Sequence, residues 1–219
     1  MISLNNAILA AANLQITDLS YSVGDTIFEH GAPAPFVYVV NKGALVRFRS
    51  LPGGRRSILQ FLFAGDGFGY EPSGYHRATV QALTDAEVVA AGRKDVMAAS
   101  KSNSKALFGA AARAFVIAEE QAAYVRRTAT ERTALFLLEM HTRLSADNRI
   151  LLPMTRRDIA DYLGLTVETV SRAMNEFRRA KIIEIRDRQP RRIIVRTKAR
   201  LERLASLASD GSKFEWWKR

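Results

Sequence analysis

The edges of nucleic-acid bases could be read by four residues near the end of the chain: Val167, Glu168, Ser171 and Arg172. They fall at the start of an expected helix, on the face turned away from its apolar residues. A guanidinium can bond guanine O6 and N7, a carboxylate can accept from cytosine N4, and a short serine lets the helix approach closely. Glu168 could also accept from Arg172 and hold it in place. The alternative is an ordinary surface ion pair between these two, which stabilises a helix by about 0.2–0.5 kcal/mol.

A second set of residues around this helix could hold a phosphate backbone, because guanidinium, ammonium and hydroxyl groups donate to phosphate oxygens. The predicted phosphate contacts are Thr155, Arg156, Arg157, Thr166, Thr169, Arg178, Arg179, Lys181, Arg191 and Arg192, with Arg188 on the same turn. The charge balance agrees: residues 151–219 carry 17 Lys and Arg against 9 Asp and Glu, in a chain of net charge +11. Such a segment favours an anionic partner, and nucleic acid is the leading one. The alternative is a basic surface that serves solubility.

Local signals predict the elements that position these residues. Thr155–Asp158 has the form of a capping box, with Asp in place of the usual Glu, and a short helix should follow it until Gly164. Thr166 can cap a second helix, whose inward face should carry Val170, Met174 and Phe177. The apolar runs at 182–185 and 193–195 predict two strands around a basic turn. Helix, tight turn, helix and hairpin together form a winged helix-turn-helix.

The first half of the chain has a different pattern, with short apolar or alternating runs between glycine-containing turns over residues 17–99. This spacing predicts an antiparallel β sandwich or roll. The expected strands are Phe36–Val40, Ala44–Phe48, Ser57–Phe63, Ala78–Leu83 and Glu87–Ala91.

Residues 104–140 lack proline and have an apolar or neutral residue every three or four positions, which predicts a long helix. Its length favours a seam between two identical chains. The seam residues are Leu107, Ala110, Ala114, Ile117, Gln121, Tyr124 and Thr128. A core helix lying on the roll is the alternative, and both readings are compatible because a second apolar stripe runs beside the first.

The chain resembles the Crp–Fnr superfamily of bacterial transcription regulators over nearly its whole length. The residues that carry the resemblance are Gly24–Phe28 with Gly31, Val37–Gly43, Gly65–Gly69, Glu131–Ala134 as the end of a dimerisation helix, and Ile159–Arg172 as a helix-turn-helix. The resemblance implies an α+β fold: an antiparallel, cyclic-nucleotide-binding-like β-roll or jelly roll (residues 1–103), a long dimerisation helix and hinge (104–140), and a winged helix-turn-helix (141–219).

The pattern Glu168-x-x-Ser171-Arg172 is similar to that of the Fnr and FixK branches, which read palindromes resembling TTGAT-N4-ATCAA. The Crp branch carries an arginine where this chain has Val167, so a TGTGA site is disfavoured. The resemblance implies a cytoplasmic homodimer that binds double-stranded DNA, is not an enzyme, and activates transcription. The loop Pro72–His76 would lie where relatives contact RNA polymerase; the alternative is a plain polar turn.

The resemblance also implies an ancestral cyclic-nucleotide pocket, of which Gly69, Tyr70, Arg77 and Thr79 would be the degenerate remains. Tyr70 stands where the family has glutamate, and the adenine-contacting hydroxyl pair falls at 117–118, which is apolar. We therefore expect no cofactor and no dependence on cyclic AMP. A ligand-gated regulator stays open as an alternative, through cyclic nucleotide or through haem with His30, His76, His141 or any of the five methionines as ligands.

Cysteine is absent, which excludes disulfides, thiolate-bound zinc or iron–sulfur clusters and a cysteine nucleophile. No apolar run approaches the roughly 18 residues of a membrane span, so we expect no membrane partner. A further alternative is a sensory binding protein whose basic part contacts RNA or another protein. The Trp216–Trp217 tail could pack on either part of the chain or stay disordered.

Overall fold

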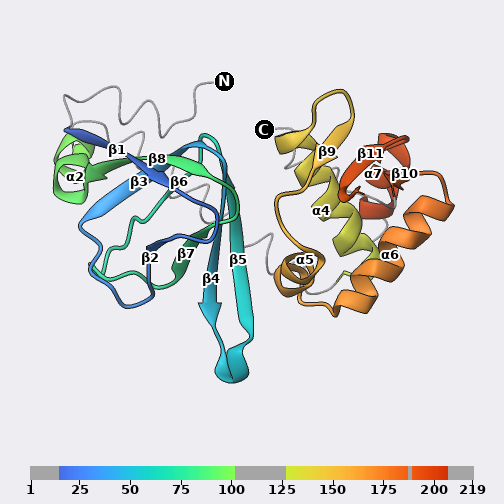
Figure 1. Cartoon of the computed structure of the whole chain (residues 1–219), viewed down its shortest axis with the longest axis horizontal. Coiled ribbons are helices and arrows are strands. Elements are labelled where there is room, and N and C mark those ends of the chain that lie inside the picture. Colours follow the sequence, from blue (N-terminus) through green and yellow to red (C-terminus); the bar gives the residue numbers. More distant parts are fainter. Residues whose placement is uncertain (1–14, 102–126, 187–188, 207–219) are drawn as a thin grey trace. The chain divides into compact units, whose positions relative to one another are not determined.

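The structure is a computed structural model that describes residues 15–101, 127–186 and 189–206 (Figure 1). The chain divides between Glu119 and Glu120 into two compact units. Each unit is described by itself below.

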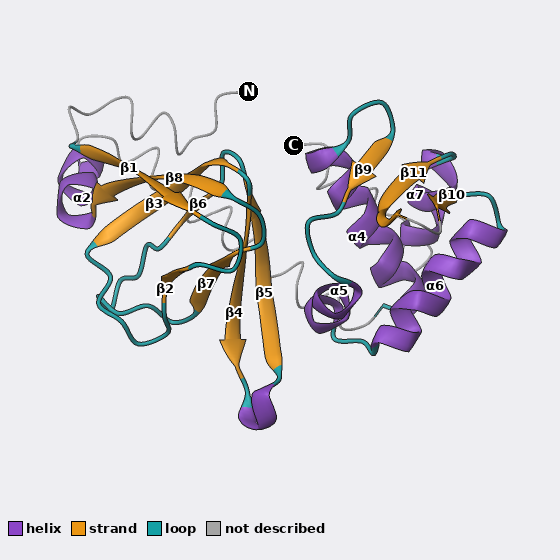
Figure 2. Cartoon of the chain, in the orientation of Figure 1, coloured by secondary structure: helices purple, strands orange, loops and turns teal. Residues whose placement is uncertain are grey.

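The first unit is a β-roll of two antiparallel four-stranded sheets, with strand orders β1-β8-β3-β6 and β2-β7-β4-β5 (Figure 2). A short helix, α2 (Arg93–Lys101), follows the last strand, and a 3-10 turn (Pro52–Gly54) joins β4 to β5. The strands are β1 (Ile16–Tyr21), β2 (Thr26–Phe28), β3 (Phe36–Lys42), β4 (Ala44–Ser50), β5 (Arg56–Phe63), β6 (Gly67–Phe68), β7 (Thr79–Ala82) and β8 (Ala86–Gly92).

The core of the roll comes from the apolar runs recognised in the sequence. Leu45, Leu62 and Val80 are fully buried between the sheets, with Val40 and Val88 beside them. Burying a side chain of this size stabilises the fold by about 1.5–3 kcal/mol. All five expected strands are present, so the predicted antiparallel roll is confirmed.

The turn between β3 and β4 requires a glycine. Gly43 has φ +90°, and a Cβ at this position would lie 2.4 Å from the carbonyl oxygen of Asp85. Both the backbone conformation and the close approach exclude a larger residue. The glycine thereby lets the chain pass directly from β3 in one sheet to β4 in the other.

The second unit is a helical layer with a small antiparallel sheet of order β10-β11-β9 (Figure 2). Its elements are α4 (Ala129–Leu144), β9 (Arg149–Leu151), α5 (Arg156–Leu163), α6 (Val167–Arg179), β10 (Ile183–Arg186), β11 (Gln189–Val195) and α7 (Lys198–Ser206). The two helices and the hairpin of the predicted winged helix-turn-helix are α5, α6, β10 and β11. Neither β9 nor α7 was predicted.

The helix α4 has its own N-cap at Thr128, which corrects the expectation that Glu131–Ala134 form the end of a dimerisation helix. Thr128 is extended (φ −65°, ψ 162°), its hydroxyl accepts from the N–H of Glu131 at 3.3 Å, and the Glu131 carboxylate accepts from the N–H of Thr128 at 2.9 Å. Glu131–Ala134 is therefore the first turn of a separate helix and not the end of the dimerisation helix. The helical spacing runs through this point because a capped start and a continuous helix can share one apolar periodicity.

The α4 helix packs within the second unit, against α6, α7 and β9. Residues 129–140 thus belong to the DNA-binding-like unit, whereas we expected them in the linking helix. Of the expected seam, only Thr128 is described, and it caps a helix instead of lying inside one. The remaining seam residues lie outside the described ranges: Leu107, Ala110, Ala114, Ile117, Gln121 and Tyr124.

Candidate nucleic-acid interface

The helix α5 begins at the predicted capping box. The Thr155 hydroxyl accepts from the N–H of Asp158 at 3.1 Å, and the Asp158 carboxylate accepts from the N–H of Thr155 at 2.8 Å and from its hydroxyl at 2.7 Å. An N-cap of this kind stabilises a helix by about 1 kcal/mol. Asp, although one methylene shorter than the usual Glu, closes the box here.

The tight turn between α5 and α6 is built on Gly164, a left-handed C-cap with φ +65°. Arg132 of α4 stabilises this turn, because its guanidinium donates a hydrogen bond to the carbonyl of Leu163 at 3.1 Å. The next helix starts at Thr166, whose hydroxyl accepts from the N–H of Thr169 at 3.2 Å. The geometry is that of a helix-turn-helix, and Figure 2 shows α5 and α6 as successive helices with a short loop between them.

The two faces of α6 have opposite character, as predicted. Val170, Met174 and Phe177 are buried with at most 2% exposure, and Ala173 joins them. On the other side of the helix, Glu168 and Arg172 are exposed, while Val167 and Ser171 are half-buried. The buried face seats the helix in the unit, which leaves the four candidate base-reading residues on its accessible side.

Glu168 is held by the start of its own helix and not by Arg172. Its backbone N–H and the Thr166 hydroxyl bond the carboxylate and lower its pKa below the usual value. No ion pair joins Glu168 to Arg172 in the described part of the chain. The suggestion that Glu168 holds the arginine in place therefore does not describe this structure, and the guanidinium of Arg172 stays exposed.

Most of the predicted phosphate contacts are accessible. The exposed ones are Thr155, Arg157, Thr166, Arg178, Arg179, Lys181, Arg191 and Arg192; Thr169 is half-buried. Arg188 lies outside the described residues. Arg178 and Arg179 lie in the last turn of α6, where a positive charge complements the helix dipole. Sequence reasoning missed Arg200 of α7, which donates to the Ala180 carbonyl at 3.0 Å and secures that end of α6.

Arg156 differs from its neighbour Arg157. Its side chain is half-buried, its Nη1 has no solvent exposure, and burial lowers its pKa. Its guanidinium is therefore less accessible to a phosphate than that of Arg157, and the phosphate contact of Arg156 stays a prediction. Adjacent arginines on one helix point about 100° apart, and the sequence offers no sign of which one turns inward.

The pair supplies a matched test of backbone contacts. We expect Arg157→Ala to weaken binding to all DNA sequences by a similar factor and to reduce the slope of log affinity against log salt by about 1 for each bound protomer, because each protomer loses one phosphate contact. Arg156→Ala should leave that slope unchanged and lower the midpoint of thermal unfolding. Anisotropy titrations at several salt concentrations measure the first effect, and circular dichroism measures the second. The reverse assignment of the two effects would contradict this placement.

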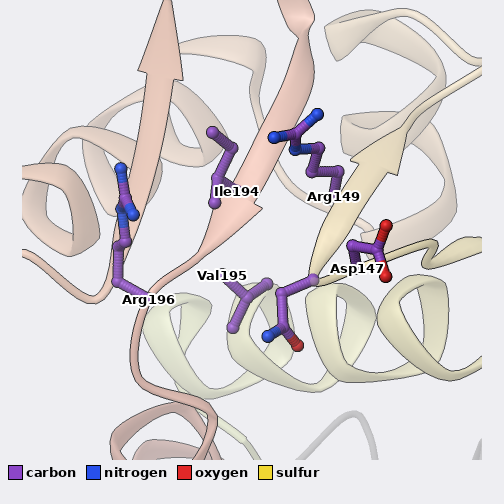
Figure 3. Close-up of a pocket in the computed structure, with 6 residues that line it drawn as sticks. Asp147, Arg149, Ile194, Val195 and Arg196 are labelled. Carbon is purple, nitrogen blue, oxygen red and sulfur yellow. The ribbon is translucent and has the colours of Figure 1, made fainter.

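A polar hollow of about 300 Å³ lies at the other end of the small sheet. It is lined by Asp147, Asn148, Arg149, Ile194, Val195 and Arg196 (Figure 3). Arg196 forms an ion pair with Glu184 of β10. None of the predicted base or phosphate contacts lines this hollow.

In the roll, the candidate pocket residues stand beside a packed group of rings. Tyr38 stacks on Phe68 with centroids 5.1 Å apart, and Phe28 lies 5.6 Å from Tyr38 and 5.9 Å from Phe68. Gly69 has φ +83°, and a Cβ there would come within 2.6 Å of the Tyr38 ring. The glycine is thus needed for close packing of the loop on the ring.

A buried carboxylate, Glu71, follows directly after Tyr70. Tyr70 is 48% exposed, whereas Glu71 is 7% exposed; Arg47 Nη2 lies 3.7 Å from its Oε1, and the N–H of Arg77 donates to the same oxygen at 3.3 Å. The Thr79 hydroxyl accepts from the backbone N–H of His30 at 3.1 Å. The guanidinium of Arg47 and the backbone N–H of Arg77 thus face Glu71, and the Thr79 hydroxyl accepts a backbone hydrogen bond.

His76 is the buried histidine of this loop. It is 2% exposed, its ring stacks on that of Phe28 with centroids 3.5 Å apart, and its Nδ1 has no hydrogen-bond partner among the described residues. Burial and the charge of Arg47 lower its pKa below 6.5, and the Glu71 carboxylate acts in the opposite direction. The folded protein therefore keeps the imidazole neutral more strongly than the unfolded chain does.

This difference predicts a pH dependence of stability. As pH falls below 6.5, the unfolded chain takes up a proton on His76 before the folded one does, so the free energy of unfolding decreases until the lower, folded pKa has been passed. We expect His76→Phe, which keeps the stacking, to flatten this loss in urea titrations between pH 8 and about pH 5. His30→Gln, at an exposed position, is the control. Equal slopes for His76→Phe and the wild type would contradict the prediction.

The other histidines do not join His76. His30 is exposed, and His141 Nε2 lies 3.0 Å from the Asn148 side-chain oxygen in the second unit. Within the described ranges, no three His, Cys, Asp or Glu side chains gather as metal ligands. The same ranges contain no helix with the length and apolar character of a membrane span.

Comparison with known proteins agrees with both units. Residues 18–103 match the family described as cyclic nucleotide-binding domain, and residues 131–204 match the Crp-like helix-turn-helix domain. The nitrogen fixation regulation protein FixK of Rhizobium meliloti is 33% identical over 169 residues, which cover 77% of this chain and 78% of that protein. The transcriptional activatory protein AadR of Rhodopseudomonas palustris is 31% identical over 173 residues, or 75% of this chain and 72% of that protein.

The solved structure of FixK2 from Bradyrhizobium japonicum aligns with a TM-score of 0.81 at 36% identity, covering 90% of this chain and 100% of that one. These relatives are transcription regulators and not enzymes, as the sequence predicted. With a roll, a helix-turn-helix and these relatives, the chain belongs to the Crp–Fnr family of transcription regulators, on its FixK branch, and carries that family's DNA-binding domain.

Proposed function

We propose that this protein is a sequence-specific transcription activator that binds, as a homodimer, a palindrome resembling TTGAT-N4-ATCAA. The observation that carries the proposal is the accessible face of α6, where Ser171 and the unpaired, exposed guanidinium of Arg172 stand opposite the buried Val170 and Met174. A helix seated in this way can enter a major groove and place its first turns against base edges. Half-sites about 34 Å apart would suit two such helices.

The proposal includes activity without a cyclic nucleotide or haem. It is supported by the roll, where the Arg47 guanidinium lies near the Glu71 carboxylate and the Thr79 hydroxyl accepts a hydrogen bond from the backbone N–H of His30. It also includes contact with RNA polymerase through the loop Pro72–His76, in which Tyr75 is 59% exposed. The name of AadR as an activatory protein agrees with the direction of the effect.

Fluorescence anisotropy of the ligand-free protein tests the proposal. The palindrome, a TGTGA palindrome and a scrambled duplex are compared at about 0.15 M salt, with and without cyclic AMP. We expect tight, selective binding to the first duplex without nucleotide, at two protomers per duplex. Binding that requires cyclic AMP would show a ligand-gated regulator, and equal binding to all three duplexes would contradict direct base reading. Sedimentation and transcription from a promoter with the palindrome separately test dimerisation and activation.

A further inference from the structure

The guanidinium of Arg132, near the start of α4, bonds two backbone carbonyls that are far apart in the sequence. Its Nε donates to the carbonyl of Arg127 at 3.0 Å, and its Nη1 donates to the carbonyl of Leu163 at 3.1 Å. The first carbonyl belongs to the residue just before the cap of α4, and the second belongs to the last residue of α5. One planar group therefore joins the beginning of the second unit to the turn of its helix-turn-helix.

The two carbonyls differ in how they are held. Arg127 donates from its own Nη1 to the carbonyl of Ala205 near the end of α7, and the next residue, Thr128, is kept extended by the capping box of α4. The last four carbonyls of a helix, by contrast, have no partner within that helix, and they form its negative end. Leu163 is one of these, and Arg132 supplies both a donor and a positive charge. The end of α5 is thus bonded to a part of the unit that has contacts of its own.

Apolar packing and hydrogen bonds restrain this turn in different ways. Phe136 of α4 and Tyr162 of α5 have ring centroids 6.1 Å apart, a contact that holds the helices together without a strong preference for direction. A hydrogen bond weakens steeply as its angle departs from linearity, so two of them on one rigid group restrict orientation as well as distance. The guanidinium also lies against the turn itself, since a Cβ on Gly164 would be 3.7 Å from its Nη1.

We propose that Arg132 is a positioning residue for DNA recognition: its two hydrogen bonds set where α6 begins, and with it the placement of Ser171 and Arg172. Only three residues, 164–166, separate the bonded carbonyl of Leu163 from the first residue of α6. The part that concerns DNA rests on the proposed function, because it requires that α6 reads bases. The part that concerns the turn can be measured on the protein alone, so the failures of the two proposals are distinguishable.

Hydrogen exchange of the full chain without DNA, followed by NMR at single amides, tests the placement of the turn. Arg132→Lys keeps the charge but loses the planar pair of donors. We expect the N–H groups of Gly164 and Leu165, which both bond the carbonyl of Ala160, to exchange about tenfold faster than in the wild type. Arg200→Gln is the matched control, because it removes an arginine-to-carbonyl hydrogen bond at the opposite end of α6. It should leave both amides unchanged.

Anisotropy titrations, compared at equal folded fraction, test the consequence for DNA. Arg132→Lys should weaken binding to the TTGAT-N4-ATCAA palindrome by about fivefold or more, because base contacts depend on the placement of α6. Its affinity for the scrambled duplex should stay that of the wild type, since the charge is kept. Arg200→Gln should weaken both duplexes by the same factor.

Three results would overturn the inference: unchanged exchange at the turn in Arg132→Lys, unchanged selectivity in that variant, or equal losses on both duplexes, which a merely structural role would give. If the wild type itself binds both duplexes alike, the proposed function fails, and the exchange rates alone decide whether Arg132 positions the turn. The Nε–H of Arg132 in the wild type provides a test that needs no variant. Its hydrogen bond predicts slow exchange with solvent, and rapid exchange would overturn the inference even if Arg132→Lys does not fold.

Discussion

Arg172→Ala is expected to lower the preference for the palindrome over a random duplex by about 1–3 kcal/mol at each half-site, or roughly 5- to 150-fold. The guanidinium is exposed on the accessible face of α6 and no ion pair to Glu168 has to be broken before it reaches a base. Its loss would remove the predicted bidentate contact with guanine. Competition anisotropy with duplexes changed at single positions would measure the loss and locate it.

Arg157→Ala is the matched control for this experiment, since it removes an equal charge at an exposed position expected to meet phosphate. It should weaken the palindrome and the random duplex alike. A selective loss in Arg172→Ala together with an unselective one in Arg157→Ala would separate base reading from backbone attraction. Equal, unselective losses in both variants would remove Arg172 from the base-reading set.

Phe177→Ala should lower the free energy of unfolding of the second unit by about 3–5 kcal/mol. The ring is 2% exposed on the inward face of α6, and the carbonyl of Phe177 accepts from the N–H of Ile182 at 2.9 Å where the helix passes into β10. The cavity left by the ring would weaken the packing of α6 against the rest of the unit. DNA affinity should therefore fall in step with the folded fraction measured by circular dichroism in urea.

The control for this cavity is Phe36→Ala at the start of β3, where the ring is 44% exposed. The same atoms are deleted, but much of their surface is already in water, so we expect a loss below about 1 kcal/mol. Similar losses for the two variants would show that burial does not decide the cost. A stable Phe177→Ala protein with lost DNA binding would instead assign the ring a role beyond packing.

The sequence predicts this fold well wherever the signal is local. The capping box Thr155–Asp158 and the left-handed Gly164 each depend on residues a few positions apart, and the inward face of α6 follows from a spacing of three and four. The roll could be predicted for the same reason, because its turns and alternating strands repeat within short windows. The candidate base-reading residues of α6 could then be predicted as the residues on the face opposite its apolar side chains.

The predictions that differ from the structure concern features that depend on tertiary packing. Thr128 and Glu131 show a capping-box spacing, yet a helical periodicity that continues past them hides the break. Two further features depend on contacts with residues distant in the sequence: the partly buried side chain of Arg156 and the burial of Glu71 next to the exposed Tyr70. A third, the hydrogen bond between Glu168 and Thr166, depends on the rotamer of Glu168. No spacing rule distinguishes these from their alternatives, and the three-dimensional contacts are required.

The second unit begins with a capped helix, and its first and last described residues lie close together. Arg127, just before the cap of α4, donates to the carbonyl of Ala205 near the end of α7 at 2.5 Å, so the two ends of the unit lie together and are joined by a hydrogen bond. A unit that completes its own first helix and keeps its ends adjacent can be exchanged as a cassette. Residues 127–206 meet both conditions for such an exchange, because their first helix has its own cap at Thr128 and their two ends lie together.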